Sequence, residues 1–227
     1  MHIIIYSRVS SNRLSEKALI KLSNQKKLIE QVICQAKLIV PKKKIILATT
    51  KKKEDLKLCK IAQKYKINYF RGSNNDLISR TLDCCKKFKV SFFFRYCADR
   101  PIIDVKKIKK CISNSKKIRF DLMTTNYLNN KIDEGFTIEI FNATSLKKMA
   151  SYKLNNNDKE HIANYFYKKR KIFDIKKIKF SKKFKKGYKY TIDTFDDLSK
   201  MNFILKNYNP NNISSVVGLS EKYEKLN

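Results

Sequence analysis

No apolar run in this 227-residue sequence approaches the roughly 20 residues that a membrane-spanning helix needs. The first apolar run, residues 3–6, is short and is followed by a polar, arginine-containing segment. This order differs from that of a signal peptide, in which a longer apolar region precedes a small-residue cleavage site. Internal repeats and long linkers are missing too. We therefore expect a cytoplasmic protein that does not enter the membrane.

Zinc-binding patterns are also missing. The sequence has only two histidines, and none of its six cysteines forms a C-x-x-C pair. Because zinc sites draw on closely spaced cysteine and histidine ligands, a zinc site is not expected. The cysteines lie among apolar or helical residues, and we interpret them as small hydrophobic core residues.

Acidic residues are few compared with basic ones. The chain has 52 Lys and Arg against 20 Asp and Glu, a net charge of +32. Such an excess is typical of proteins that bind nucleic acids or anionic membranes. Here, however, lysines are spread along the whole chain, isoleucine and asparagine are abundant, and glycine and proline are scarce. We interpret this as a drift in composition and expect no specific nucleic-acid partner.

Hydrophobic residues nonetheless make up 42% of the chain, enough for a globular core. Strands are predicted at residues 3–6, 44–50, 67–72, 90–97, 120–125, 136–141, 172–180 and 188–192. Helices are predicted at residues 25–38, 54–65, 73–88, 105–112, 144–152, 159–167 and 194–205. This alternation predicts an α/β fold with a mainly parallel, doubly wound sheet. We expect one domain over residues 1–206 and a polar, loosely packed C-terminal tail over residues 207–227.

The segment after the first strand is suited to a polyphosphate. Residues 2–19 read HIIIYSRVSSNRLSEKAL, and the loop carries hydroxyls and cations, namely Arg8, Ser10, Ser11, Arg13 and Lys17. In open α/β sheets, ligands bind beyond the carboxyl ends of strands. Serine hydroxyls and backbone N–H groups can hold phosphate oxygens, and cations neutralise their charge. The alternative is a solvated basic turn.

Two aspartates follow predicted strands, at what should be the same edge of the sheet. Asp99 comes shortly after the strand at residues 90–97, and Asp193 directly follows the last strand. Two carboxylates there suit Mg²⁺, which prefers oxygen ligands and shares them with phosphates. In an empty site their charges would repel each other. The alternatives are a turn-forming role for Asp99 and a helix cap for Asp193, although Thr194 and Asp197 already supply a capping box.

Six further polar residues lie in or near the ends of predicted elements: Arg71, Ser73, Arg80, Glu139, Glu160 and His161. Arg71 can reach a phosphate or a base edge, and a surface salt bridge is the alternative. Strand alternation puts Glu139 on the face opposite the apolar residues of its strand. Glu160 and His161 are predicted to open a helix, where a lone histidine is more often a structural hydrogen-bonding group.

Six segments in order resemble the cytidylyltransferase family: IIIYSRVSSNRLSEKAL, YFRGSNNDLISR, FFFRYCADRPIID, EGFTIEIF, KEHIANYFYKKR and YTIDTFDDL. The resemblance runs from residue 3 to about residue 205. It is greatest to the branch of spore coat polysaccharide biosynthesis protein F, which is related to the acylneuraminate and 3-deoxy-manno-octulosonate cytidylyltransferases. It implies a Rossmann-like nucleotidyltransferase fold, with three α/β/α layers and a mainly parallel sheet.

The resemblance also implies roles for the residues singled out above. The family's first loop binds the phosphates of CTP, and this role carries over to Arg8, Ser10, Ser11, Arg13 and Lys17. The family's magnesium-binding acids fall on Asp99 and Asp193. Its nucleotide-side segment matches Arg71, Ser73 and Arg80, and its segments near the sugar match Glu139, Glu160 and His161. Among these residues, we expect catalytic roles for Arg8, Lys17 and Asp99.

The sequence departs from the family pattern at four places. Ser10 and Ala98 replace usual glycines, and Ser15-Glu16 replaces a Pro-Gly pair before the lysine. Fewer glycines narrow the backbone conformations that the loop can adopt. Thr137 stands where an acid is common, which leaves the sugar specificity open.

The predicted reaction transfers CMP from CTP to a sugar acid or sugar derivative and releases pyrophosphate, for a surface polysaccharide or glycan. The implied partners are CTP, the sugar and Mg²⁺, and relatives suggest a homodimer. One alternative is a relative that binds a nucleotide or a partner without turnover. The other is a basic nucleic-acid-binding protein.

Overall fold

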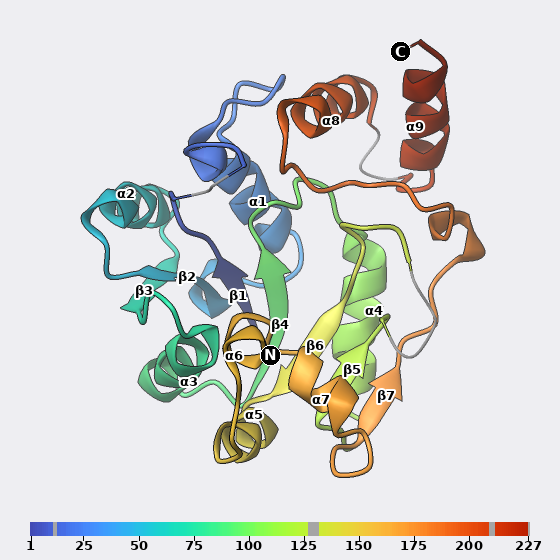
Figure 1. The fold of residues 1–227 in the computed structure, drawn as a ribbon. Coiled ribbons are helices and arrows are strands. Elements are labelled where there is room, and N and C mark those ends of the chain that lie inside the picture. The colour runs from blue at the N-terminus through green and yellow to red at the C-terminus, as the bar shows by residue number, and fades with distance from the viewer. Residues whose placement is uncertain (11–12, 127–131, 209–211, 227) are drawn as a thin grey trace.

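A seven-stranded sheet forms the centre of the computed structural model, which describes residues 1–10, 13–126, 132–208 and 212–226 (Figure 1). The strand order is β3-β2-β1-β4-β6-β5-β7. The bounds are β1 (His2–Tyr6), β2 (Ile45–Thr50), β3 (Asn68–Gly72), β4 (Phe92–Cys97), β5 (Leu122–Thr124), β6 (Glu139–Asn142) and β7 (Ile175–Lys177). Within the described ranges, β6 runs antiparallel to its neighbours β4 and β5, and the other pairings are parallel. The mainly parallel sheet is thus confirmed.

The two central apolar runs explain why the sheet is covered on both faces. Every residue of β1 and of β2 is buried, as expected for strands inside a parallel sheet. Successive side chains of a strand point to opposite faces. Ile3 and Ile5 therefore pack into one apolar core, and Ile4 and Tyr6 pack into a second.

Helices cover both cores and give the three α/β/α layers. Their bounds are α1 (Leu28–Lys37), α2 (Leu56–Lys64), α3 (Leu77–Phe88), α4 (Val105–Ser115), α5 (Ala143–Ala150), α6 (Asn156–Glu160), α7 (Asn164–Lys168), α8 (Phe195–Asn207) and α9 (Ser215–Leu226). Helices α1, α2, α4, α8 and α9 contribute apolar residues to the first core, and α3, α5 and α7 contribute to the second. The predicted fold class is confirmed.

Local capping signals place several helix starts. The Thr194–Asp197 capping box of α8 is present as predicted. At α3, the residue that caps the helix is Asp76, whose Oδ1 accepts a hydrogen bond from the Ser79 amide at 2.8 Å. Ser73 instead accepts a hydrogen bond from the Asp76 amide, so α3 begins about one turn later than expected.

The helix predicted at residues 159–167 is wrong. The chain forms two short helices there, and His161 between them has φ −117° and ψ 85°, outside the helical region. Asn155 starts α6 early through a capping box with Asp158. Ile162, directly after the break, is fully buried in the second core.

The strand predicted at residues 188–192 does not join the sheet. Its backbone pairs with two different segments: Tyr190 donates to the Glu134 carbonyl, and Ile192 donates to the Asp99 carbonyl. Because neither segment offers a continuous strand edge, no ladder forms. The segment still runs to Asp99, so it brings Asp193 to the carboxyl edge of the sheet.

Residues 215–226, within the expected tail, form helix α9 and pack against the domain. Val216 is fully buried in the first core, and Ser220 Oγ lies 3.2 Å from the Tyr190 hydroxyl. This part of the tail is therefore packed more tightly than its polar sequence suggests. None of the helices in the described residues has both the length and the apolar character needed to cross a bilayer.

Candidate active site

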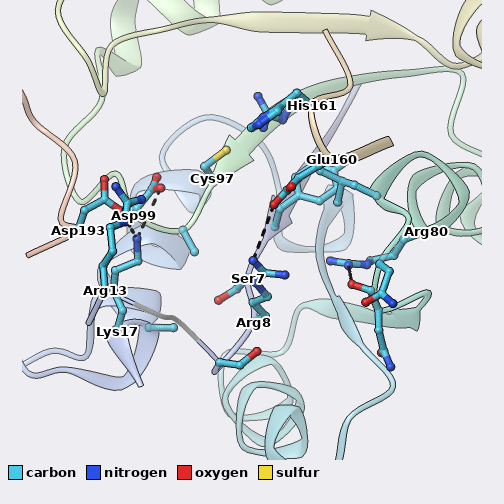
Figure 2. A pocket seen from close by; sticks show the side chains of 18 residues that line it. Ser7, Arg8, Arg13, Lys17, Arg80, Cys97, Asp99, Glu160, His161 and Asp193 are labelled. Carbon is cyan, nitrogen blue, oxygen red and sulfur yellow. Dashed lines mark hydrogen bonds and ion pairs between the residues drawn. The ribbon is translucent and has the colours of Figure 1, made fainter. Parts of the chain in front are cut away.

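A cleft of about 550 Å³ opens beyond the carboxyl ends of β1 and β4 (Figure 2). Its wall comes from the loop after β1, the start of α3, the end of β4 and the end of α6. This is the edge at which open α/β sheets bind ligands. Four of the five residues proposed to bind phosphate line it: Arg8, Ser10, Arg13 and Lys17. The fifth, Ser11, lies outside the described residues.

The loop after β1 is tied to the neighbouring strand by a buried carboxylate. Val9 N donates a hydrogen bond of 2.7 Å to Oδ1 of Asp55, which is fully buried. The other oxygen of Asp55 accepts hydrogen bonds from the amide and hydroxyl of Thr50, at the end of β2. Asp55 was not singled out from the sequence. It fixes the backbone between Arg8 and Ser10, so it positions the loop.

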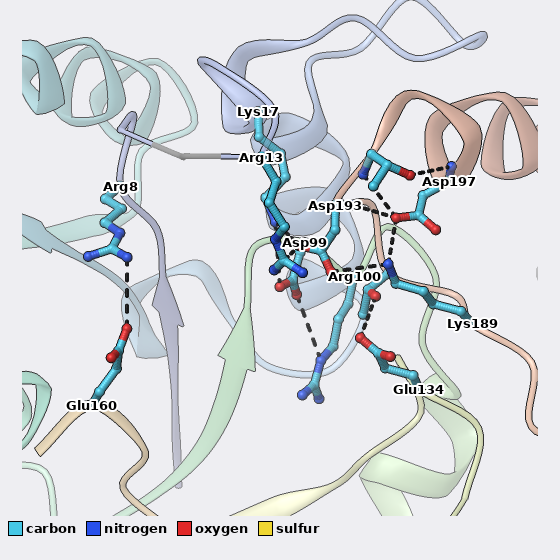
Figure 3. Close-up of polar contacts among 12 residues, drawn as sticks. Arg8, Arg13, Lys17, Asp99, Arg100, Glu134, Glu160, Lys189, Asp193 and Asp197 are labelled. Atoms are coloured by element: carbon cyan, nitrogen blue, oxygen red, sulfur yellow. Dashed lines mark hydrogen bonds and ion pairs between the residues drawn. The ribbon is translucent and has the colours of Figure 1, made fainter. Parts of the chain in front are cut away.

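The two predicted metal-binding aspartates both lie beside the ammonium group of Lys17 (Figure 3). Lys17 Nζ lies 2.7 Å from Asp193 Oδ1 and 3.8 Å from Asp99 Oδ2. Arg13 Nη2 also lies 2.8 Å from Asp193 Oδ1. The expectation of two repelling charges in an empty site therefore needs correction, because cations from the β1 loop neutralise them.

Asp193 is held as a carboxylate by its surroundings. Its side chain is only 6% exposed, and Lys189 Nζ lies 3.3 Å from Oδ2. Burial alone would raise the pKa of Asp193, but the hydrogen bond from Lys17 and the charges of Lys17, Lys189 and Arg13 hold that pKa below its usual value. No local pattern in the sequence points to Lys189, since its contact with Asp193 depends on the irregular path of residues 188–192.

The donor set at Asp99 and Asp193 fits a magnesium ion shared with a nucleotide. Asp99 Oδ1 is buried, accepts no hydrogen bond and lies 3.9 Å from Arg100 Nε, so the protein leaves this oxygen without a donor at hydrogen-bond distance. Mg²⁺ takes one or two carboxylates and completes its shell with water and phosphate oxygens. In the described residues, no group of three or more His, Cys, Asp or Glu side chains gathers as a metal site. The metal would thus depend on oxygens from the nucleotide.

Arg80, matched to the family's nucleotide-side segment, lines the cleft from α3. It is 5% exposed, and its Nε donates to the Ser73 carbonyl at 2.8 Å. Burial lowers its pKa from the usual arginine value. Gly72 leaves room for it, because a Cβ at Gly72 would lie 2.6 Å from Arg80 Cγ.

Arg71 and Ser73 do not line the cleft, although they match the nucleotide-side segment. Arg71 donates to the carbonyl oxygens of Thr50, Lys51 and Lys52, so it closes the edge between β3 and β2. Ser73 contributes its carbonyl to Arg80 and its hydroxyl to the turn before α3.

The residues matched to the sugar site divide into two groups. Glu160 and His161 line the cleft at the end of α6, rather than at the start of a helix, and Glu160 Oε1 lies 4.0 Å from Arg8 Nη2. Glu139 is buried behind the wall and accepts a hydrogen bond of 2.7 Å from Arg95. Arg95 itself lines the cleft, and sequence reasoning missed it. The available signal was a single charge inside the apolar run VSFFFRYC.

Comparison with known proteins adds evidence on fold and family. A family model described as Cytidylyltransferase matches residues 2–222. The structure of a cytidylyltransferase from Leptospira borgpetersenii serovar Hardjo-bovis (strain JB197) is similar, with a TM-score of 0.87 and 26% identity over 99% of this chain and 93% of that chain. An uncharacterized protein from Methanocaldococcus jannaschii is 29% identical over 195 residues, 86% of this chain and 78% of that protein.

A more distant likeness concerns the fold alone. The structure of CMP:2-keto-3-deoxy-manno-octonic acid synthetase complexed with CTP has a TM-score of 0.67 and 12% identity, over 91% of this chain and 98% of that chain. The expected nucleotidyltransferase-like α/β fold is confirmed by this likeness.

Proposed function

The chain belongs to the cytidylyltransferase family, and we propose that it transfers CMP from CTP to a sugar acid or sugar derivative. An acceptor oxygen forms a bond to the α-phosphorus, the bond from that phosphorus to the bridging oxygen breaks, and pyrophosphate leaves. The acceptor proton passes to water. The observation that supports this proposal is one cleft in which Lys17 joins two strand-end carboxylates, Asp99 and Asp193, beside the arginines of the β1 loop.

The charged and hydroxyl side chains of the β1 loop and the two aspartates have roles in this proposal. Arg8, Arg13 and Lys17 bind the β- and γ-phosphates and neutralise their charge, and Ser10 and Ser11 offer hydroxyls to the phosphate oxygens. When bound, Mg²⁺ on Asp99 and Asp193 supplies further charge neutralisation at the reacting phosphate. The protein acts by positioning and electrostatics, without a covalent intermediate.

The two ends of the cleft take the two substrates. The nucleoside end lies against Arg80, whose Nε donates to the Ser73 carbonyl, while Arg71 donates to the Thr50 carbonyl at the nearby edge between β3 and β2. The sugar end lies against Glu160 and His161, with Glu139 buried behind the wall. We place the reaction in the cytoplasm, in the synthesis of a surface polysaccharide or glycan. The order of the six sequence segments supports a place near the branch of spore coat polysaccharide biosynthesis protein F.

Nucleotide choice is tested by the melting temperature in the presence of Mg²⁺. A ligand that binds only the folded state stabilises it by mass action. CTP should therefore raise the melting temperature more than ATP or GTP at the same concentration. Equal shifts for all three nucleotides would contradict the cytidylyl assignment and leave a general nucleotide site.

A further inference from the structure

Arg95 is a charged residue in the wall of the cleft that the reaction described above does not use. It lies in β4, two residues before Cys97, so both side chains leave the same face of the strand. Both line the cleft, and the Arg95 side chain is 16% exposed. Arginine is rarely this buried unless it is paired or bound to a ligand.

The Arg95 guanidinium is only partly satisfied by the protein. Nη1 donates a hydrogen bond of 2.7 Å to Glu139 Oε2. Nε is buried and has no hydrogen-bond partner, and no acceptor for Nη2 is found among the described residues. A buried donor on a charged group is costly when it is left unpaired, so such a group calls for an explanation. Nε and Nη2 form one edge of the guanidinium, and such an edge can donate two parallel hydrogen bonds to one carboxylate or phosphate.

A chain of hydrogen bonds behind the wall holds this guanidinium in place. Glu139, in β6, is 7% exposed, and its Oε1 accepts a hydrogen bond of 3.3 Å from the Tyr167 hydroxyl. That hydroxyl also lies 2.9 Å from Thr124 Oγ1, in β5. Burial raises the pKa of Tyr167 well above its usual value, so the hydroxyl keeps its proton and donates. Residues of β5, β6 and α7 thus orient the Arg95 guanidinium from the side away from the cleft.

The other cations of the cleft differ from Arg95 in position or in hydrogen bonding. Arg8, Arg13 and Lys17 come from the β1 loop. Arg80 donates hydrogen bonds from Nε and Nη2 to the carbonyl oxygens of Ser73 and Asn74. Arg95 pairs with Glu139, which belongs to a segment matched to the sugar, and it lines the cleft together with Glu160 and His161 (Figure 2). Arg95 is therefore placed toward the acceptor rather than toward the β- and γ-phosphates.

We infer that Arg95 is a specificity-determining residue that binds an anionic group, a carboxylate or a phosphate, on the acceptor. Glu139 and Tyr167 are positioning residues that hold its guanidinium. This inference rests on the proposed function and deepens it, because it makes the acceptor an acidic sugar and not a neutral one. It also gives Glu139 an indirect role: Glu139 acts through Arg95 and does not touch the sugar.

The variants are chosen so that no buried charge is stranded. Arg95→Met alone would leave Glu139 unpaired, so the test uses Arg95→Met combined with Glu139→Gln. Arg95→Lys keeps the charge but loses the planar edge. Lys176→Met removes an exposed ion pair with Asp174 outside the cleft and serves as the control.

Binding is measured by calorimetry for 3-deoxy-manno-octulosonate, its methyl ester, glucose 1-phosphate and glucose, and separately for CTP with Mg²⁺. The wild-type protein should bind one acidic probe at least about tenfold more tightly than its neutral partner, the effect of a charge-assisted hydrogen bond. The pair that shows the preference identifies a carboxylate or a phosphate. The double variant should lose the preference and keep its CTP affinity within about twofold. Arg95→Lys should keep part of the preference, and Lys176→Met should match the wild type.

Two results overturn the inference. One is a wild-type protein with no preference for either acidic probe. The other is a double variant whose CTP affinity falls as much as its affinity for the acidic probe, which would place Arg95 at the nucleotide. Failure of the proposed function looks different: CTP then fails to bind or to release pyrophosphate, while the preference for an acidic probe and its loss in the double variant are still measured.

Discussion

Lys17 Nζ lies 2.7 Å from Asp193 Oδ1, although the two residues are far apart in the sequence. The same ammonium lies 3.8 Å from Asp99 Oδ2. One cation of the proposed phosphate-binding loop thus lies near both carboxylates of the proposed metal site. The cations of the loop and the two aspartates are thus linked by ion pairs, so a substitution at one of them changes the charge environment of the others.

Asp193→Asn should lower both stability and turnover. The substitution leaves Lys17, Arg13 and Lys189 around a neutral side chain, and we expect a loss of about 1–2 kcal/mol, between the values for exposed and buried ion pairs. Pyrophosphate release should fall about 100-fold or more, since an anionic ligand is lost from a charge-stabilising site. Urea denaturation and a pyrophosphate assay measure the two effects. An unchanged unfolding free energy would show that the three contacts contribute nothing.

Asp99→Asn should lower turnover with little effect on stability. Asp99 contacts Lys17 only at 3.8 Å and Arg100 only at 3.9 Å, so the folded state should lose little stability. Pyrophosphate release should again fall about 100-fold or more. Near-normal turnover with unchanged Mg²⁺ dependence would show that Asp99 and Asp193 are not the metal pair.

Asp104→Ala is the matched control for both aspartate variants. Asp104 caps α4, and its Oδ1 accepts a hydrogen bond of 2.8 Å from the Lys107 amide. Loss of this cap should cost about 1 kcal/mol of stability. Turnover measured well below the melting temperature should stay at the wild-type value, and a loss like that of Asp99→Asn would contradict a purely structural role.

His2 predicts a specific dependence of stability on pH. Burial, together with the charges of Lys44 and the N-terminus, lowers the pKa of His2 to about 4. In the unfolded chain, His2 has the ordinary histidine pKa of about 6.5. Between about pH 6.5 and pH 4, His2 is therefore protonated in the unfolded chain and neutral in the folded chain. Stability should therefore fall as the pH drops from about 6.5 toward 4. Urea midpoints at pH 7 and pH 5 should differ in the wild type and differ less in His2→Phe; equal pH dependence in both proteins would exclude His2 as the cause.

Gly72→Ala should disturb Arg80. The added Cβ would lie 2.6 Å from Arg80 Cγ and 2.7 Å from Phe70 Cε1, so side chains must shift. We expect a loss of about 1–3 kcal/mol, the usual cost of overpacking, and weaker CTP binding because Arg80 lines the cleft. Gly218→Ala is the control, since a Cβ there meets no atom within 4 Å. Wild-type CTP affinity in Gly72→Ala would place Arg80 outside the nucleotide site.

The sequence predicted what local patterns determine. The apolar runs of β1 and β4 and the capping box at Thr194 were found because each depends on neighbours in the chain. The association of Arg95 with Glu139 was not found. It depends on the antiparallel pairing of β4 with β6, and a single sequence does not show which strands lie side by side.

Two other features show the same limit. Residues 188–192 have the composition of a strand, but no continuous strand edge is available to them, so Asp193 reaches Asp99 along an irregular path. At residues 159–167, the helical periodicity did not reveal the break at His161, which is followed by the fully buried Ile162. In both places tertiary contacts override a valid local pattern.

The most direct test of the account is the product formed from CTP. Wild-type protein is incubated with CTP, Mg²⁺ and either 3-deoxy-manno-octulosonate, N-acetylneuraminate or glucose 1-phosphate. Pyrophosphate is quantified, and the products are identified by mass spectrometry. We predict one pyrophosphate per CMP-linked acceptor with at least one acidic sugar, with much less conjugate from ATP or GTP and an approximately 100-fold loss in Asp99→Asn. Pyrophosphate with free CMP and no conjugate, or equal conjugate from all nucleotides, would contradict the account.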